Sequence, residues 1–504
     1  MGFFFLILYL AVSYLSPAQI YPELAQYRIV LWIAIAAGLA SVPSLLRQMK
    51  FWNAPQTKLL LGLVGALILS EVSRFWFGGI VFALEGFMPV LVVFFLICIH
   101  VDSWNRLSIL AILMATIALF FLGHAVWDLE TGNLSSPYLF DMHWGSGQSR
   151  FSFLRIRAVG YLADPNDLAQ FLIVVLPLVA LPWNKTKKLR NLLFVILPSA
   201  FIVYGIYLTH SRGAILALVV LAVLVASRWI PLAVSGGMGA LLFAGMMALG
   251  FSGGRDISLS SGADRIELWG IGLEMLRSSP LWGIGYGQFS NHAPMTAHNS
   301  YVLCLAEVGA IGYTLWLAAI VITMLQLNSM AAVPQSSSKV TNLEASAPDL
   351  TTLQTFTLAS AGGSDSPPSE LPEAQEDNEE RAHWAPALAT VQTFDLEIAG
   401  SNDSPPPEDS AAQRDDEERV RRWAKVLRMS FLGFLVTAWF LSRTYTITLY
   451  VLLGMTVVLT TFLKESPEES QERCRNWIPI TAGAEFFTIV AIYLIVRFQD
   501  LFMN

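Results

Sequence analysis

The chain has 504 residues, of which 55% are hydrophobic and only 14% are charged, and its formal net charge is −7. A soluble protein of this length would carry more charge, so the composition excludes an ordinary soluble enzyme and points to a membrane protein. The three cysteines lie far apart and lack metal-type spacing, which argues against a disulfide framework and against a zinc site.

Long apolar runs predict an all-α polytopic membrane protein with about 12–13 transmembrane helices. A run of about 18 or more apolar residues is long enough to cross a bilayer as a helix. The shortest candidates are the first and the eighth, and we interpret the first as a retained helix. The candidate runs are 1–15, 28–46, 59–73, 80–99, 106–127, 167–182, 191–209, 213–227, 231–250, 299–326, 427–442, 446–463 and 478–496.

Basic residues between these runs predict the topology, because cytoplasmic loops carry an excess of Lys and Arg. Three basic groups share one side if the N-terminus is cytoplasmic. They are Arg47, Lys50 and Lys58; Lys185, Lys187, Lys188 and Arg190; and Arg421, Arg422, Lys425 and Arg428. The helix order then predicts that segments 128–166, 210–212 and 251–298 lie together on the outer side.

The chain divides into four predicted parts. Membrane helices occupy 1–127 and 426–504, and a core at 128–326 carries the outer loops 128–165 and 251–297. The remaining part, 327–425, is predicted to be a disordered cytoplasmic insert, because it is rich in Ser, Pro and Ala and poor in large apolar residues.

The insert is acidic and internally repeated. Residues 331–420 hold 18 Asp and Glu against 4 Lys and Arg, a balance of −14, so the rest of the chain carries +7. Gln354-Thr355-Phe356 recurs 38 residues later as Gln392-Thr393-Phe394. Two copies are too few for a solenoid. An expanded linker and a partner-docking tail both remain open.

Two of the outer segments place arginine at a membrane edge. Arg157 precedes Asp164-Pro-Asn166, a pattern in which Asp164 or Asn166 can simply cap a helix. Arg212 lies in a tight turn between two apolar runs. Because arginine near lipid is costly unless it snorkels or meets an anion, Arg212 is a candidate anion ligand.

The third outer segment, 251–298, is the longest. Residues Asp264–Ser278, which include Arg265, have amphipathic spacing and predict a helix that could lie flat in the interface. A following glycine-rich stretch, 280–289, suggests a close backbone approach to another group, and it lacks the Lys-Ser/Thr of a phosphate loop.

His298 closes this segment, at the point where the next apolar helix begins. The positive end of a helix disfavours imidazolium, so a neutral imidazole able to accept a proton is plausible at pH 7. A histidine that only packs or caps is the alternative. The outer segments contain no Asp-X-Asp pair, which suggests metal-free chemistry in which arginines neutralise a leaving pyrophosphate.

These motifs together resemble the bacterial O-antigen ligase / O-antigen polymerase membrane family over roughly residues 150–325. The matching pieces are Arg157-x-x-Gly160 with Asp164-Pro-Asn166 and Pro177; Ser211-Arg212-Gly213; Arg265 with Trp269; Pro280-x-x-Gly283-x-Gly285-x-Gly287-x-Phe289; and Ala297-His298-Asn299-Ser300 with Glu307-x-Gly309-x-x-Gly312. The insert and a possible thirteenth helix depart from the family pattern.

The resemblance implies a GT-C-like fold and a glycosyltransferase of lipopolysaccharide or polysaccharide biosynthesis in the cytoplasmic (inner) membrane. Such an enzyme moves a glycan from a polyprenyl-pyrophosphate carrier to a glycan, lipid A-core or protein acceptor on the periplasmic or outer side. Membrane lipid is expected as a partner, and no nucleic acid, metal or cofactor is expected. The expected site residues are His298 as catalytic base; Arg157, Arg212 and Arg265 as substrate ligands; and Asp164, Asn166, Asn299 and Glu307 in support.

Three alternatives remain open. A transporter or flippase of lipid-linked glycan would fit the helix count, and a protein O-oligosaccharyltransferase would share the donor chemistry. A non-catalytic scaffold would act through the acidic insert. Transporters place polar groups near the membrane midplane, often in related halves, whereas here Glu85 is the main charge within an apolar run.

Overall fold

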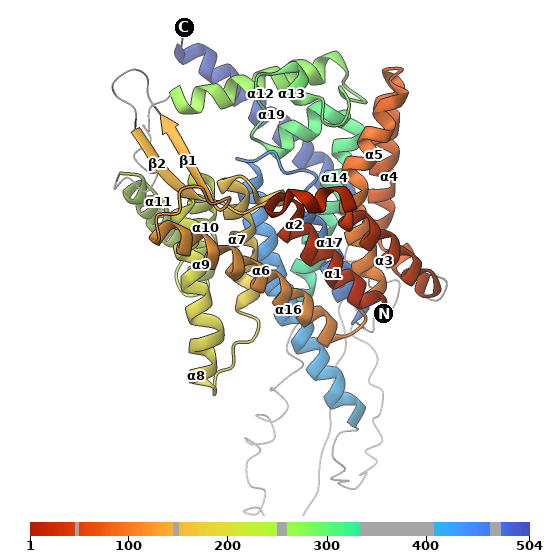
Figure 1. Cartoon of the computed structure of the whole chain (residues 1–504), viewed down its shortest axis with the longest axis vertical. Helices are drawn as coiled ribbons and strands as arrows, with labels where there is room; N and C mark the ends of the chain where they lie inside the picture. The colour runs from red at the N-terminus through yellow and green to blue at the C-terminus, as the bar shows by residue number, and fades with distance from the viewer. Residues whose placement is uncertain (46–49, 145–150, 249–259, 333–407, 464–474, 504) are drawn as a thin grey trace, which may run out of the picture. The chain divides into compact units, whose positions relative to one another are not determined.

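The computed structural model describes residues 1–45, 50–144, 151–248, 260–332, 408–463 and 475–503 (Figure 1). Residues 1–333 and 415–504 form one compact unit, and residues 334–414 form another. The regular structure of the described residues is helical except for one two-stranded hairpin. The prediction of an all-α membrane protein is therefore confirmed, and the hairpin is an addition to it.

The elements of the first half, labelled as in Figure 1, precede the α9–α10 turn. They are α1 (Gly2–Leu15), α2 (Pro17–Ile20), η1 (Pro22–Tyr27), α3 (Ile29–Leu45), η2 (Lys50–Asn53), α4 (Pro55–Ser73), α5 (Phe77–His100), α6 (Trp104–Glu130), β1 (Leu139–Trp144), β2 (Phe151–Ile156), η3 (Gly160–Leu162), α7 (Pro165–Val179), α8 (Lys188–Asn191), the π-helical turn η4 (Leu192–Ile196) and α9 (Leu197–Leu208).

The second half contains the longest helix, α14. Its elements are α10 (Arg212–Ala226), α11 (Leu232–Ala248), α12 (Ser260–Ser278), α13 (Phe289–His292), α14 (Ser300–Ala332), α16 (Glu408–Ala438), α17 (Ile447–Thr461) and α19 (Trp477–Met503).

Every predicted apolar run coincides with a helix, but not every helix has the length of a membrane span. Within the described ranges, 8 helices are long and apolar enough to cross a membrane, and α7, α10, α11 and α17 are apolar but only 15–17 residues long. Fewer helices than the 12–13 predicted meet this length criterion, because these four apolar helices are shorter than the others. The apolar runs continued into turns, such as Leu181 and Pro182 after α7.

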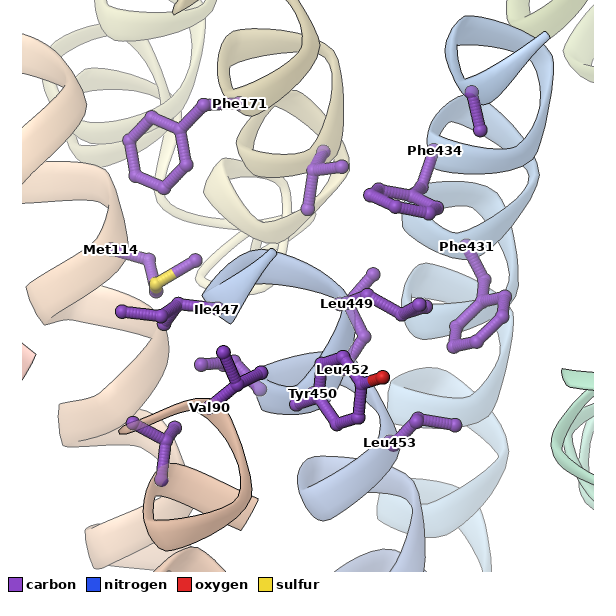
Figure 2. Close-up of a cluster of buried hydrophobic side chains, with 14 of the residues drawn as sticks. Val90, Met114, Phe171, Phe431, Phe434, Ile447, Leu449, Tyr450, Leu452 and Leu453 are labelled. Atoms are coloured by element: carbon purple, nitrogen blue, oxygen red, sulfur yellow. The ribbon is translucent and has the colours of Figure 1, made fainter. Parts of the chain in front are cut away.

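Helix α17 lies inside the protein. All its residues from Ile447 to Leu459 are buried, and it packs against α5 and α14. A helix that is apolar on every face needs such a position. Figure 2 shows α17 among buried side chains of four other helices: Val90 of α5, Met114 of α6, Phe171 of α7, and Phe431 and Phe434 of α16. The C-terminal helices therefore belong to the same core as the N-terminal ones.

Helix α14 is broken near its start, and the glycine-rich loop fills the break. Gly309 has φ 62° and ψ −170°, which interrupts the helix. The amides of Ala310 and Ile311 donate to Pro280 O (2.8 Å) and Leu281 O (3.3 Å) instead of to the preceding turn. The helix carbonyls freed by this change accept from the loop: Ala306 O from Ile284 N and Glu307 O from Gly285 N, both at 2.9 Å.

The two backbones approach so closely that only glycine fits. A Cβ at Gly283 would lie 2.4 Å from the carbonyl of Glu307, and a Cβ at Gly309 would lie 2.4 Å from Leu281 O. Both residues also have positive φ, which L side chains rarely adopt. The close approach predicted for the glycine-rich stretch is therefore an approach to the backbone of α14.

The ends of the predicted disordered insert are helical, which corrects its boundaries. Helix α14 continues to Ala332, and α16 begins at Glu408, so 327–332 and 408–425 are ordered. Segment 408–425 is rich in Ala, Glu and Arg, which favour helix, and Glu417 and Arg421 have the i, i+4 spacing that supports one. Both copies of the duplicated segment lie outside the described residues, apart from the end of the second.

Candidate active site

The hairpin β1–β2 brings a buried arginine to the first outer segment. The strands pair antiparallel, with Phe140 opposite Arg155. The Arg155 side chain is buried, and its Nε donates to Thr209 O at 2.7 Å while Nη2 donates to Asn166 Oδ1 at 3.0 Å. Arg155 thus ties the hairpin to the α9–α10 turn and to the start of α7.

Arg157, the arginine predicted from the sequence as a substrate ligand, makes other contacts than Arg155. Its Nε donates to Pro137 O at 3.0 Å, and its guanidinium lies 5.6 Å from the centre of the Phe140 ring. These contacts hold it against the hairpin. It is the Arg155 side chain, and not that of Arg157, that hydrogen-bonds to the α9–α10 turn.

Asp164 caps α7, as the sequence pattern allowed. Its Oδ1 accepts from the backbone N of Asn166 at 2.7 Å and from the side-chain amide of Asn166 at 2.9 Å, and Pro165 is the first helical residue. The capping carboxylate orients Asn166, whose Oδ1 receives the Arg155 bond. Asp164 and Asn166 are therefore connected to the hairpin through Arg155, and their role in the site stays a prediction.

The turn between α9 and α10 presents Arg212 at the first position of α10. His210 has φ 49°, and Ser211 is the N-cap. The His210 ring packs edge-on against Phe153 and Tyr207, with ring centres 5.6 Å apart in each case. A Cβ on Gly213 would lie 3.0 Å from the Phe440 side chain, so this end of α10 packs tightly on the α16–α17 link.

Helix α12 forms as predicted, but it packs against α14 and α19. Trp269 is buried and its Nε1 donates to Ala297 O at 3.1 Å, next to His298. Arg265 lies one turn before Trp269, beside Arg212. Burial and the positive charge of Arg212 lower the pKa of Arg265, and Asp164 opposes the shift. Arg265, Arg212 and Asp164 therefore form one electrostatic group.

His298 stands immediately before the N-cap of α14. It has φ 49°, the left-handed conformation that few side chains adopt without a structural reason. The next residue, Asn299, caps the helix by accepting from Tyr301 N at 2.9 Å and Val302 N at 3.1 Å. The chain therefore turns sharply at His298, and the cap fixes where that turn lies.

The pKa of the half-buried His298 is lowered from the ordinary 6.5. Burial is the main cause, and the charges of Arg265 and Arg443 add to it, while Asp164 acts in the opposite direction. The neutral imidazole expected from the sequence is thus supported, but by burial and neighbouring arginines.

A fourth segment, the link between α16 and α17, completes the group with Arg443. Its Nε and Nη2 bind both carboxylate oxygens of Asp167, which is 3% exposed. The link is fastened to the start of α14, because Arg443 N donates to Ser300 Oγ at 2.8 Å and Thr444 Oγ1 donates to Ser300 O at 2.7 Å. Sequence reasoning missed Arg443, although it lies in the same kind of short turn as Arg212.

Two buried carboxylates fix the glycine-rich loop behind this group. Glu71 Oε1 accepts from Tyr286 N at 2.8 Å, and Glu307 Oε1 accepts from Phe289 N at 3.4 Å. Glu307 therefore contacts the glycine-rich loop, and its supporting role in the site stays a prediction. Glu71 was missed, and the signal for it was a carboxylate inside an apolar run.

The three outer segments and the α16–α17 link thus converge. Arg212, Arg265 and Arg443 carry three positive charges, and Asp167 is bound to one of them. Arginine binds phosphate oxygens in a bidentate manner and keeps its charge. In the part of the chain that the structure describes, no group of three or more His, Cys, Asp or Glu is arranged to hold a metal ion. The arrangement can hold a pyrophosphate beside a proton acceptor.

Residues 194–317 match the family model described as O-antigen ligase. The match contains Arg212, Arg265, His298 and Glu307, whereas Arg155 and Arg443 lie outside it. No curated protein and no solved structure is a match to the chain.

Proposed function

We propose, from the premise that this multi-pass membrane protein carries an O-antigen ligase domain at residues 194–317, that it is a metal-independent glycosyltransferase. It transfers a glycan from a polyprenyl-pyrophosphate carrier to an acceptor hydroxyl. The reaction takes place on the outer face of the cytoplasmic membrane, where the helix order and the positive-inside rule put the site segments.

The observation that carries the proposal is the grouping of Arg265 and Arg443 with His298, whose pKa is lowered, and of Arg212 with Arg265. A pyrophosphate leaving group develops negative charge as its bond to the sugar breaks. Fixed positive groups stabilise that charge in the transition state without reorganising at the moment of reaction. The two functions needed, anion stabilisation and proton acceptance, thus lie side by side.

The transfer forms one bond and breaks one bond. The acceptor hydroxyl oxygen forms a bond to the anomeric carbon of the donor sugar, and the bond from that carbon to the pyrophosphate oxygen breaks. The leaving polyprenyl pyrophosphate keeps the electron pair, and the arginines neutralise it. His298 takes the proton of the acceptor hydroxyl.

The acceptor is a second glycan, a lipid A-core or a protein, and these share the donor chemistry. The surface glycans of a null strain separate them. If the null strain loses long surface chains but keeps free core and carrier-linked polymer, the protein is a ligase. If its surface chains consist of a single unit, the protein is a polymerase. An unchanged glycan profile with lost glycoproteins identifies a protein O-oligosaccharyltransferase.

The test of the site is complementation of the null strain with His298→Ala or Arg212→Ala. Both variants should insert normally and lose transfer by at least about a hundredfold, the usual size of a lost acid–base or anion-stabilising group. Arg277→Ala, an exposed arginine in the last turn of α12, is the matched control and should keep wild-type transfer. Normal transfer by both site variants would refute the assignment.

A flippase of the same lipid-linked glycan is the competing function. It predicts that the null strain accumulates carrier-linked glycan on the inner leaflet, whereas the transferase predicts accumulation on the outer leaflet. The accessibility of the carrier-linked glycan to a lectin added to spheroplasts distinguishes the two.

A further inference from the structure

A second polar site lies on the same helix as Arg265. A cavity of about 650 Å³ is bounded by the end of α4, the C-terminal half of α12, the glycine-rich loop and α13. Its polar and aromatic lining includes Arg74, Glu274, Ser278, Ser279, Trp282 and His292. None of these residues belongs to the arginine–histidine group described above, and the family resemblance assigns none of them a role.

The charges of the cavity differ from those of the arginine–histidine group. The lining holds one arginine and one glutamate, Arg74 and Glu274, so it has no formal excess of positive charge that would select a pyrophosphate. Carboxylate and guanidinium together accept and donate hydrogen bonds. A ligand that is neutral and carries many hydroxyl groups satisfies both.

The remaining walls fit the same ligand. Trp282 is half-buried, and an indole ring gives a flat apolar surface on which the C–H face of a sugar can lie. His292 Nδ1 is 3.0 Å from Gln288 O, so Nδ1 carries the proton and Nε2 is the nitrogen left for a ligand. The Ser278 hydroxyl donates to Met275 O at 2.7 Å and keeps its acceptor lone pairs.

The cavity is held at a fixed separation from the reacting group. Glu274 follows Arg265 by nine residues in one continuous helix, which is about 14 Å along the helix axis. The other wall includes Ile284, whose N donates to Ala306 O at the α14 break, and α14 begins just after His298. A chain of sugars, rather than a single one, would reach from one place to the other.

We propose that this cavity binds a sugar ring of the glycan chain, remote from the bond that is made. The inference rests on the proposed function, since it gives the glycan substrate a second point of attachment. The ring belongs either to the donor glycan or to the accepting glycan, which share this chemistry.

The experiment measures binding of two carrier-free oligosaccharides to the purified full-length protein. One is released by mild acid from the host's lipid-linked donor, and the other is the core oligosaccharide of the host's surface glycan. We expect one of them to bind wild type and His298→Ala equally. Trp282→Ala and Glu274→Gln should bind it at least about tenfold more weakly, the change expected from loss of a central contact.

Trp282→Phe should restore most of the binding, and Glu267→Gln, an exposed glutamate elsewhere on α12, should bind as wild type does. Equal binding by wild type, Trp282→Ala and Glu274→Gln, or no binding of either oligosaccharide by a wild type that transfers glycan, would overturn the cavity inference. Wild-type transfer by His298→Ala would instead overturn the proposed function, and the binding comparison would still decide the cavity.

Discussion

His298 combines two features that rarely meet in one residue. Its backbone is left-handed, and its pKa is lowered by burial and by two arginines. Left-handed conformations of non-glycine residues persist only where the surroundings impose them. Here the Asn299 cap on one side and the Trp269 bond to Ala297 on the other impose the turn. The cap and the Trp269 bond thus fix the backbone at His298, while burial, Arg265 and Arg443 lower the pKa of its imidazole.

The lowered pKa predicts the pH dependence of transfer. A base works unprotonated, so activity is full near pH 7 and falls only as the pH drops through a pKa that lies below 6.5. Arg265→Gln removes one positive neighbour and should move this acid limb upward. Arg443→Gln, a smaller contributor, should move it less. The pH–rate profiles of the residual transfer test this, and an acid limb above 6.5 in wild type would contradict it.

Arg443 should matter for both stability and transfer. Its loss leaves the carboxylate of Asp167 buried without its partner, which should lower the free energy of unfolding by about 1–3 kcal/mol, less than for a fully buried pair because Arg443 is 39% exposed. Thermal unfolding of Arg443→Ala in detergent measures this. The double variant with Asp167→Asn should regain the stability but not the transfer. Restored transfer in the double variant would show that Arg443 acts only through Asp167.

The sequence predicted Arg212 and His298 because each stands at the edge of an apolar run, where a charge needs a reason, and the family resemblance added Arg265. It did not predict Arg443 or Glu71. Arg443 satisfies the same criterion but lies far along the chain from the others, and only tertiary packing brings the α16–α17 link to His298. Arg157 stays a predicted substrate ligand. That Arg155 is the buried arginine of the hairpin could not be predicted from sequence, because it depends on the pairing of β1 with β2.

At the scale of elements, the joint between the glycine-rich loop and α14 positions two parts of the site. Helix α12 ends just before the loop, and His298 lies just before α14. The sequence indicated that the glycines approach another group closely, but it did not show that this group is the backbone of α14. A break inside an apolar run leaves the hydropathy pattern unchanged. The helices in the apolar runs were predicted well, because a helix surrounded by lipid and a helix buried in protein both require apolar residues.

Alanine at Gly283 or Gly309 should open this joint. Each substitution puts a Cβ 2.4 Å from backbone atoms and forces an L residue into a positive φ, so each should cost about 2 kcal/mol or more of unfolding free energy. Gly483→Ala is the control, because a Cβ there meets nothing within 4 Å. Measured in detergent, the free energy of unfolding of Gly483→Ala should lie near that of wild type, and those of the other two variants should be lower. Equal stability of all three variants would contradict the close backbone contact between the glycine-rich loop and α14.

At the scale of the whole molecule, helices from both ends of the chain enclose one core, and the site draws on 128–166, 210–212, 264–309 and 439–446. The match to the O-antigen ligase family model covers only 194–317. The residues around it were predicted as membrane helices without a role, since hydropathy does not tell which interior helix touches which. The assignment of membrane sides stays a prediction.

The acidic insert should be dispensable for transfer. Every residue that we assign to the arginine–histidine group lies outside 334–407, so replacing 334–407 by a short Gly-Ser linker should retain at least about half of wild-type transfer in the complemented null strain. A scrambled 334–407 segment of the same composition serves as the control for expression. Loss of transfer in the deletion with normal membrane insertion would favour the scaffold alternative.

A break in a helix is ordinarily its softest point, where amide protons exchange readily with solvent. At the break in α14, the amides of Ile284 and Gly285 in the glycine-rich loop donate to α14 carbonyls, and the α14 amides of Ala310 and Ile311 donate to loop carbonyls. None of them can open without also releasing the others. They should therefore exchange hydrogen as one slow, cooperative group, and the interruption becomes the stiffest place along α14 rather than its hinge.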